Sequence, residues 1–258
     1  LFAVMLYAGI EVAGSNGVSA AQGKVMVTIT DKAFQINGTA TFFQMKGQLT
    51  GDLAVQVGWD PTVYVRGAIS LELKIPKTVT GLGEVQFYAG NNVFAVKGNV
   101  DLMIVETIRA YAEVIVVPSG FTANLGLQIK KATSVVEVDV GGNLRIWYRP
   151  STNDLGAYTQ AYGNVKAFGV PTEIRIVAAL VVMPELAIYG QGTARVVGVD
   201  PLKFEVWVQY TSRGLEAGLG RSEELASVLA NAEQIAVDLE AEADGILAGI
   251  DEAERARA

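Results

Sequence analysis

Apolar and polar residues alternate with a period of two along most of residues 1–211, which is typical of strands buried on one face. The clearest run is residues 63–75. One set of alternate positions there is polar or charged apart from one alanine, and the other set is Val63, Val65, Gly67, Ile69, Leu71, Leu73 and Ile75. Residues 121–130 and 202–209 repeat this pattern. A helix would scatter these apolar residues around its axis, so the pattern predicts strands.

Short turn signals separate the alternating runs. They include Asp31-Lys32, Asn91-Asn92, Pro118-Ser119-Gly120 and Asn153-Asp154, together with Asp60-Pro61. Adjacent strands joined by short turns pair as antiparallel hairpins, because a parallel return needs a long crossover. We therefore predict an all-β fold, mainly an antiparallel meander of about 14 long amphipathic strands, followed by one long C-terminal amphipathic α-helix.

The meander contains a tandem repeat of about 60 residues. Gly23-Lys24-Val25-Met26-Val27 and Gly83-Glu84-Val85-Gln86-Phe87 are 60 residues apart, and a third copy opens at Gly142-Asn143-Leu144. We expect the following organisation: 1–22, the end of a preceding β repeat; 23–82, 83–141 and 142–191, three β repeats; 192–214, final strands; and 215–258, an acidic amphipathic helix.

Residues 1–13 alternate like the last strand of a repeat whose earlier strands are absent from the chain, which begins with leucine. This pattern favours a piece of a longer repetitive protein. A secretory signal, with Val18-Ser19-Ala20 as a cleavage site, is the competing interpretation, but it lacks a basic start.

After Tyr210 the period changes to that of a helix. Ser222 is a candidate N-cap, and Glu223 and Glu224 follow it in the first turn, where the helix dipole favours negative charge. The apolar stripe that we call the helix seam consists of Leu225, Leu229, Ala232, Ala236, Leu239, Ala243, Ile246 and Ile250. Its 4-3 spacing predicts an amphipathic helix of about 36 residues. The seam suits packing on this chain's own sheet, a coiled coil or a neighbouring subunit.

The apolar strand residues are expected to form one extended face. Its predicted members are Val63, Val65, Ile69, Leu71, Leu73, Phe94, Val96, Leu102, Leu125, Leu127, Phe204 and Val206. About 14 strands of about 11 residues give a face on the order of 2,400 Å². Soluble monomers seldom expose apolar patches beyond a few hundred Å², and the helix would cover only about a quarter of this one.

The composition of the chain excludes several classes of catalytic and metal-binding site. The chain has no cysteine and no histidine, which excludes a disulfide scaffold, thiolate metal sites and histidine general bases. The net charge is −7, and the residues from Glu216 onward carry a net charge of −8, so the strand region is nearly neutral. It holds no cluster of Lys and Arg for nucleic-acid phosphates. We expect no cofactor, no metal and no enzymatic activity.

Several local motifs favour structural interpretations. Gly218-Leu219-Gly220 has Glu223 where a dinucleotide-binding loop needs its third glycine. We therefore interpret these glycines as the turn that precedes the helix. Glu137 and Asp139 have the spacing of a catalytic carboxylate pair, but they also suit two solvent-exposed acids on one strand. Asn37-Gly38-Thr39 is a glycosylation sequon, but it lies inside a predicted strand. The aromatic residues at polar strand positions or strand ends suit cross-strand pairs or a carbohydrate or partner contact: Trp59, Trp147, Trp207, Tyr148 and Tyr210.

Three functions suit an apolar face of this size. The first is a structural or assembly module of a larger extracellular or surface protein, with other copies or other segments of that protein as partners. The second is a lipid-binding or lipid-transfer β-groove, and the third is an outer-membrane β-barrel. The sequence favours the first and indicates no nucleic-acid partner.

Overall fold

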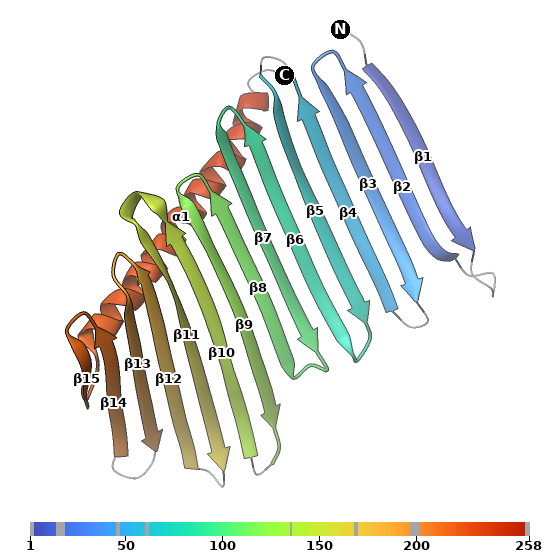
Figure 1. Cartoon of the computed structure of the whole chain (residues 1–258). Coiled ribbons are helices and arrows are strands. Elements are labelled where there is room, and N and C mark those ends of the chain that lie inside the picture. The colour runs from blue at the N-terminus through green and yellow to red at the C-terminus, as the bar shows by residue number, and fades with distance from the viewer. Residues whose placement is uncertain are drawn as a thin grey trace. The chain divides into compact units, whose positions relative to one another are not determined.

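A computed structural model describes residues 3–13, 19–44, 47–59, 62–134, 136–167, 170–196 and 202–255. Within these residues, fifteen strands form one antiparallel β meander, in which sheet neighbours follow chain order, and one long C-terminal helix follows (Figure 1). This confirms the predicted fold class. Turn residues at the predicted positions include Asn91 and Asn92, which both adopt positive φ, as a two-residue hairpin turn requires. Asp60-Pro61 lies outside the described residues.

Strands β1 to β8 are 10 to 12 residues long. Their bounds are β1 Ala3–Ala13, β2 Ser19–Thr30, β3 Ala33–Gln44, β4 Gly47–Gly58, β5 Tyr64–Ile75, β6 Val79–Gly90, β7 Val93–Ile104 and β8 Ile108–Val117.

The second half of the chain continues the same pattern and ends in the helix. Its elements are β9 Gly120–Ala132, β10 Val136–Arg149, the short 3-10 helix η1 Pro150–Thr152, β11 Asp154–Ala167, β12 Val170–Met183, β13 Ala187–Val196, β14 Leu202–Thr211, β15 Gly214–Leu219 and α1 Glu223–Arg255.

Strand β15 is one strand more than the sequence predicted. The region assigned from residue 215 to the acidic helix opens with this strand, because Leu215, Ala217 and Leu219 still alternate with Glu216 and Gly218. Helix α1 then begins at Glu223. The predicted N-cap is confirmed: the Leu225 backbone N–H donates to Ser222 Oγ at 3.1 Å.

The chain divides into two compact units. Unit 1 comprises Leu1–Glu106, Glu113–Pro118 and Ala241–Ala258; unit 2 comprises Thr107–Ala112 and Ser119–Glu240. Each unit combines consecutive strands with part of α1. The predicted repeat starts at residues 23, 83 and 142 fall inside strands β2, β6 and β10, and the repeat organisation stays a prediction.

Candidate functional site

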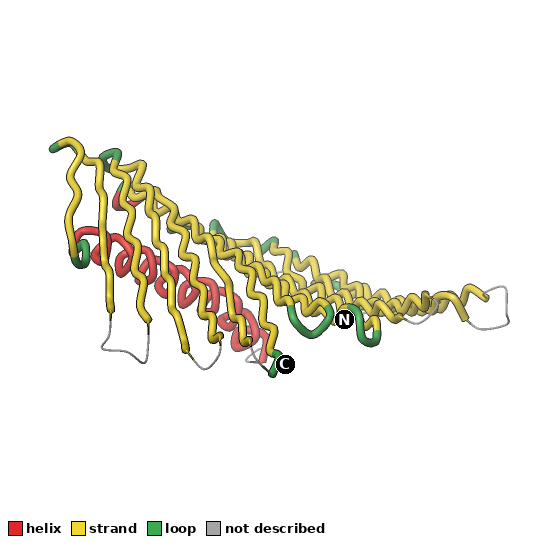
Figure 2. Tube along the Cα trace, turned by 90° about the horizontal axis from the view of Figure 1, so that it is seen from below, coloured by secondary structure: helices red, strands yellow, loops and turns green. Residues whose placement is uncertain are grey.

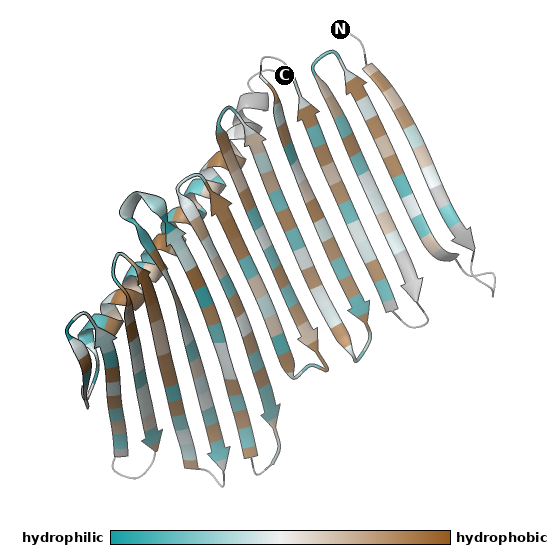
Figure 3. Ribbon diagram, in the orientation of Figure 1, coloured by the Kyte–Doolittle hydropathy of each residue, from teal (hydrophilic) through white to brown (hydrophobic). Residues whose placement is uncertain are grey.

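The strands of unit 1 carry an apolar face without a polar side chain in its central rows. One row across β2 to β7 consists of Val25, Gly38, Leu53, Ile69, Val85 and Gly98, each opposite the next. The adjacent row consists of Val27, Ile36, Val55, Gly67, Phe87 and Val96. We call this side the apolar face of unit 1. The alternating colour along each strand in Figure 3 reflects the same two-residue period.

Unit 2 has an apolar face of the same kind. One row across β9 to β15 consists of Leu127, Gly142, Ala161, Ile176, Gly192, Val206 and Leu219. A neighbouring row includes Leu125 and Leu144 and contains one polar residue, Thr159. In both units, alternation therefore sorts the side chains onto two chemically distinct faces.

Most of the predicted face residues are solvent-exposed. Val63 precedes β5, and the others lie within strands: in unit 1 Val65, Ile69, Leu71, Leu73, Phe94, Val96 and Leu102, and in unit 2 Leu125, Leu127, Phe204 and Val206. Of these, Val65, Leu73, Val96 and Leu102 are half-buried and the rest are exposed. The structure thus places the eleven residues that lie within strands on the apolar faces, and their role in packing or lipid binding stays a prediction.

On the apolar face of unit 1, large side chains fill the space above glycines of the neighbouring strand. A Cβ built on Gly81 would come within 2.3 Å of Leu102 Cδ2, and one on Gly67 within 2.5 Å of the Phe87 ring. The space above Gly51 is likewise taken by Leu71, at 3.0 Å. Large side chains therefore lie over glycines of the neighbouring strand, which reduces the relief of the surface.

The opposite face, rather than the apolar one, carries the helix in each unit. Its side chains alternate with those of the apolar faces, and in unit 2 its residues Arg145, Arg149 and Tyr158 bond to α1. In unit 1 Lys97, between Val96 and Gly98, pairs with Asp244 of α1 at 2.9 Å. Figure 2 shows the helix along one side of the strands. The expectation that α1 would cover part of the apolar face is wrong, because its acidic residues find their cationic partners on the other side.

On the helix-bearing face, aromatic rings lie over glycines of the neighbouring strand. Trp147 covers Gly156, Trp207 covers Gly218 and Tyr162 covers Gly141, each directly opposite in the sheet. In unit 1, Tyr64 lies directly opposite Gly58 on one neighbouring strand and Gly90 on the other, and it occupies the space above both. Rings that lie flat let a helix approach the sheet closely, and Trp147 is only 1% exposed.

The helix seam is turned inward along most of its length. Leu225, Ala232, Leu239 and Ala243 are buried, whereas Leu229, Ala236 and Ile246 are half-buried. The side chain of Ile250 lies outside the described set. Of the three partners that the sequence left open for the seam, the structure shows this chain's own sheet.

Charged contacts fix the helix on the sheet of unit 2. Glu233 accepts hydrogen bonds from Arg145 and from the Tyr158 hydroxyl. Burial of the phenol, reinforced by its hydrogen bond to Glu233, raises the pKa of Tyr158 to about 12. One turn further on, Arg149 Nη2 donates to Asp238 Oδ2 at 2.8 Å, and this bond lowers the pKa of Asp238 below its usual value.

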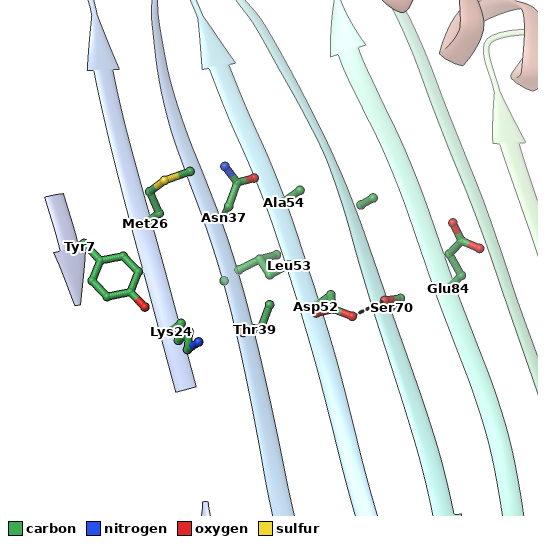
Figure 4. A pocket seen from close by; sticks show the side chains of 12 residues that line it. Tyr7, Lys24, Met26, Asn37, Thr39, Asp52, Leu53, Ala54, Ser70 and Glu84 are labelled. Atoms are coloured by element: carbon green, nitrogen blue, oxygen red, sulfur yellow. Dashed lines mark hydrogen bonds between the residues drawn. The ribbon is translucent and has the colours of Figure 1, made fainter. Parts of the chain in front are cut away.

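Two depressions lie on the helix-bearing side, a mainly apolar one in unit 1 and a more polar one in unit 2. In unit 1, a shallow hollow of about 400 Å³ is lined by Tyr7, Lys24, Asn37, Asp52 and Glu84 from successive strands, and Ser70 Oγ donates to Asp52 Oδ2 at its floor (Figure 4). The sequon residue Asn37 belongs to this hollow and is half-buried within β3.

In unit 2, a groove of about 760 Å³ runs beside the start of α1. Its charges largely pair with one another. Glu205 accepts from Lys203 at 2.9 Å and from Arg221 at 3.2 Å, and the hydrogen bond from Lys203 lowers the pKa of Glu205. The lining of the groove includes four cationic side chains and two carboxylates, so positive charge is in excess there: Arg175, Arg195, Lys203 and Arg221 against Glu173 and Glu205.

The other predicted motifs have structural partners. Asp139 accepts from Gln128 Nε2 at 3.0 Å and lies 3.5 Å from Lys130 Nζ, while Glu137 is exposed. Gly218 lies under Trp207, and Trp59 Nε1 donates to the Asp31 carbonyl at 2.8 Å. Tyr148 and Tyr210 stand on the apolar face of unit 2, next to strand ends. Within the described ranges, no group of three or more acidic side chains could hold a metal ion.

Sequence reasoning missed the helix-docking residues Arg145, Asp154 and Tyr158. Asp154 forms part of the Asn153-Asp154 turn signal, and the sequence pattern indicated no role for Arg145 or Tyr158. The available signal was charge complementarity, since arginines recur at residues 145 and 149 while Glu233 and Asp238 recur along the helix.

No protein-family model matches the chain, and comparison with curated proteins gives no match. Among the helical residues that the structure describes, no segment is both long and apolar enough to span a membrane.

Proposed function

We propose that this chain is a non-enzymatic structural module, and that its apolar sheet faces are buried against another apolar surface in the working protein. The observation that carries this proposal is the apolar face of unit 1, whose central rows hold only apolar residues and glycine from β2 to β7. The part of helix α1 in unit 1 lies on the other side, so among the described residues of unit 1 no element covers this face.

The area involved supports the proposal. Six strands about 4.8 Å apart, each about 12 residues of about 3.3 Å, give unit 1 a face of about 1,100 Å². A surface of this size is about twice the largest apolar patch of a typical soluble monomer. Removing it from water would contribute strongly to association.

A lipid-binding surface is the second candidate. The absence of charged side chains from the central rows of unit 1 favours it, because acyl chains offer no partner for a charge. Under this alternative, the apolar face holds hydrocarbon chains rather than a protein surface.

Thiol reactivity tests whether the apolar face is covered. The chain has no cysteine, so Leu71→Cys on the apolar face and Leu82→Cys on the opposite face each introduce a single thiol. The two leucines are matched controls, since Leu71 is 50% exposed and Leu82, opposite Glu72, is 53% exposed in the free chain.

A covered face predicts that a water-soluble alkylating reagent modifies Leu71→Cys at least about 10-fold more slowly than Leu82→Cys, because a buried thiol is inaccessible and poorly ionised. In denaturant the two rates should converge. Equal rates in the folded protein would contradict the proposed function.

A further inference from the structure

We infer that the surface that covers the apolar face of unit 1 is the same face of a second copy of this chain, so that two sheets stack face to face. This inference rests on the proposed function and names the partner. It concerns the face defined by the rows through Leu53, Ile69 and Phe87.

The first argument is area. Stacking two faces of about 1,100 Å² removes roughly 2,200 Å² from water, which exceeds the roughly 1,200 to 2,000 Å² of a standard stable interface. Unit 1 alone therefore supplies enough apolar surface for a stable dimer.

The second argument is self-complementarity. A two-fold interface brings a patch against its own copy, so every charge on the patch risks meeting a like charge. The rows from β2 to β7 carry no charge, and their side chains are exposed or half-buried and therefore accessible. Such a face is compatible with itself in any alignment, and packed sheets commonly cross at about 30°.

The third argument is the low relief of the apolar face of unit 1. Leu102 over Gly81, Phe87 over Gly67 and Leu71 over Gly51 lower the highest side chains toward the sheet. Two sheets pack about 10 Å apart when their side chains interdigitate without large protrusions.

A second sheet also covers the face more completely than a layer of lipid. A single layer of acyl chains on an open sheet would still expose its outer side to water, whereas a second apolar face leaves neither side exposed. The helix-bearing face cannot take this role, because it carries Lys97, Gln86 and Arg66.

Light scattering on the full chain, purified without detergent, tests the inference. The expected particle mass is twice the chain mass of 27.3 kDa. Leu71→Arg should raise the dimer dissociation constant at least about 30-fold, because it places an unpaired charge in the interface. The matched variant Leu82→Arg should leave the dimer intact. A wild-type monomer, or an equal loss of dimer in both variants, would overturn the inference.

A second measurement does not depend on the folding of any variant. Tagged and untagged wild-type chains are co-expressed at equal levels, and the tagged chain should retain the untagged one at about half its own amount after lipid extraction, as random pairing into two-fold dimers requires. A monomer that carries co-purified lipid would overturn the second-copy inference while favouring the lipid candidate. A monomer without lipid, in which Leu71→Cys reacts as fast as Leu82→Cys, would overturn both the inference and the proposed function.

Discussion

The Trp147 indole lies over Gly156, the residue directly opposite it on the next strand, and fills the space that a side chain at residue 156 would need. Its Nε1 donates to Asp154 Oδ1 at 2.9 Å, and Asp154 Oδ2 accepts from Asn231 of α1 at 2.6 Å. A ring over a glycine is thus connected, through one carboxylate, to the helix that packs above it.

Gly156→Ala is expected to destabilise the protein by about 1–3 kcal/mol, because the new methyl must displace a buried indole. Its Cβ would lie 2.3 Å from Trp147 Cζ2 and 2.8 Å from the Leu180 carbonyl oxygen. Gly163→Ala, on the same strand, is the control: the nearest atom there is Val140 Cγ1 at 3.5 Å, so its effect should be close to neutral. Urea denaturation measures both, and equal losses would contradict this account.

Leu239→Ala tests the helix seam. Leu239 is fully buried, whereas Val237 of the same turn is 58% exposed. Truncating the buried leucine should lower the free energy of unfolding by about 2–5 kcal/mol, because it removes burial and leaves a cavity. Val237→Ala should change it by less than about 0.5 kcal/mol. Thermal unfolding followed by circular dichroism would reveal the difference, and similar values for the two variants would argue against the docked helix.

Tyr158 should make the protein sensitive to alkali. Its pKa is about 12 in the folded state against about 10 when unfolded, so the folded state holds the phenol proton more tightly. The resulting stability, on the order of 2 kcal/mol, is present below pH 10 and is lost as the pH rises toward 12. Tyr158→Phe removes this component. Denaturation curves at pH 9 to 12 should therefore converge for wild type and variant, and parallel curves would refute the assignment.

Arg149→Gln should raise the pKa of Asp238 toward its ordinary value, because the Arg149 hydrogen bond is the main cause of the lowered pKa. Gln234→Ala should act in the same direction but less, since Gln234 makes the second bond to this carboxylate. A lowered pKa stabilises the fold above the ordinary value near 3.8, and this contribution is lost as the pH falls through the lower folded pKa. Carboxyl NMR titration measures the shift directly, and an unchanged Asp238 in Arg149→Gln would disprove the contact's role.

Period-two alternation predicted the strands other than β15 and their two faces, and the short turns between them predicted their antiparallel pairing. The helical period and Ser222 likewise predicted α1 and its N-cap, because capping depends on residues near one another in the chain. The short strand β15 was missed, since three alternating residues such as Leu215, Ala217 and Leu219 are too few to stand out beside a helical pattern.

Alternation alone did not predict the face of the sheet on which α1 packs. An apolar seam and an apolar sheet face suggest that the two meet, yet α1 packs on the side that bears Arg145 and Tyr158. The flat rings of Trp147 and Trp207 make that side apolar enough for the seam, while its arginines satisfy the helix carboxylates. Both effects depend on which residues stand opposite one another, which local sequence does not specify.

The pairs of ring and glycine also determine strand alignment. A slide of β10 along β11 by two residues would keep every side chain on its own face, so alternation does not oppose it. Such a slide would move Trp147 from Gly156 to Tyr158 or Asp154, and at the other end of the hairpin it would take Gly141 away from Tyr162. Because both rings lose their glycine in either direction, two glycines suffice to select one register for a hairpin whose apolar pattern would accept several.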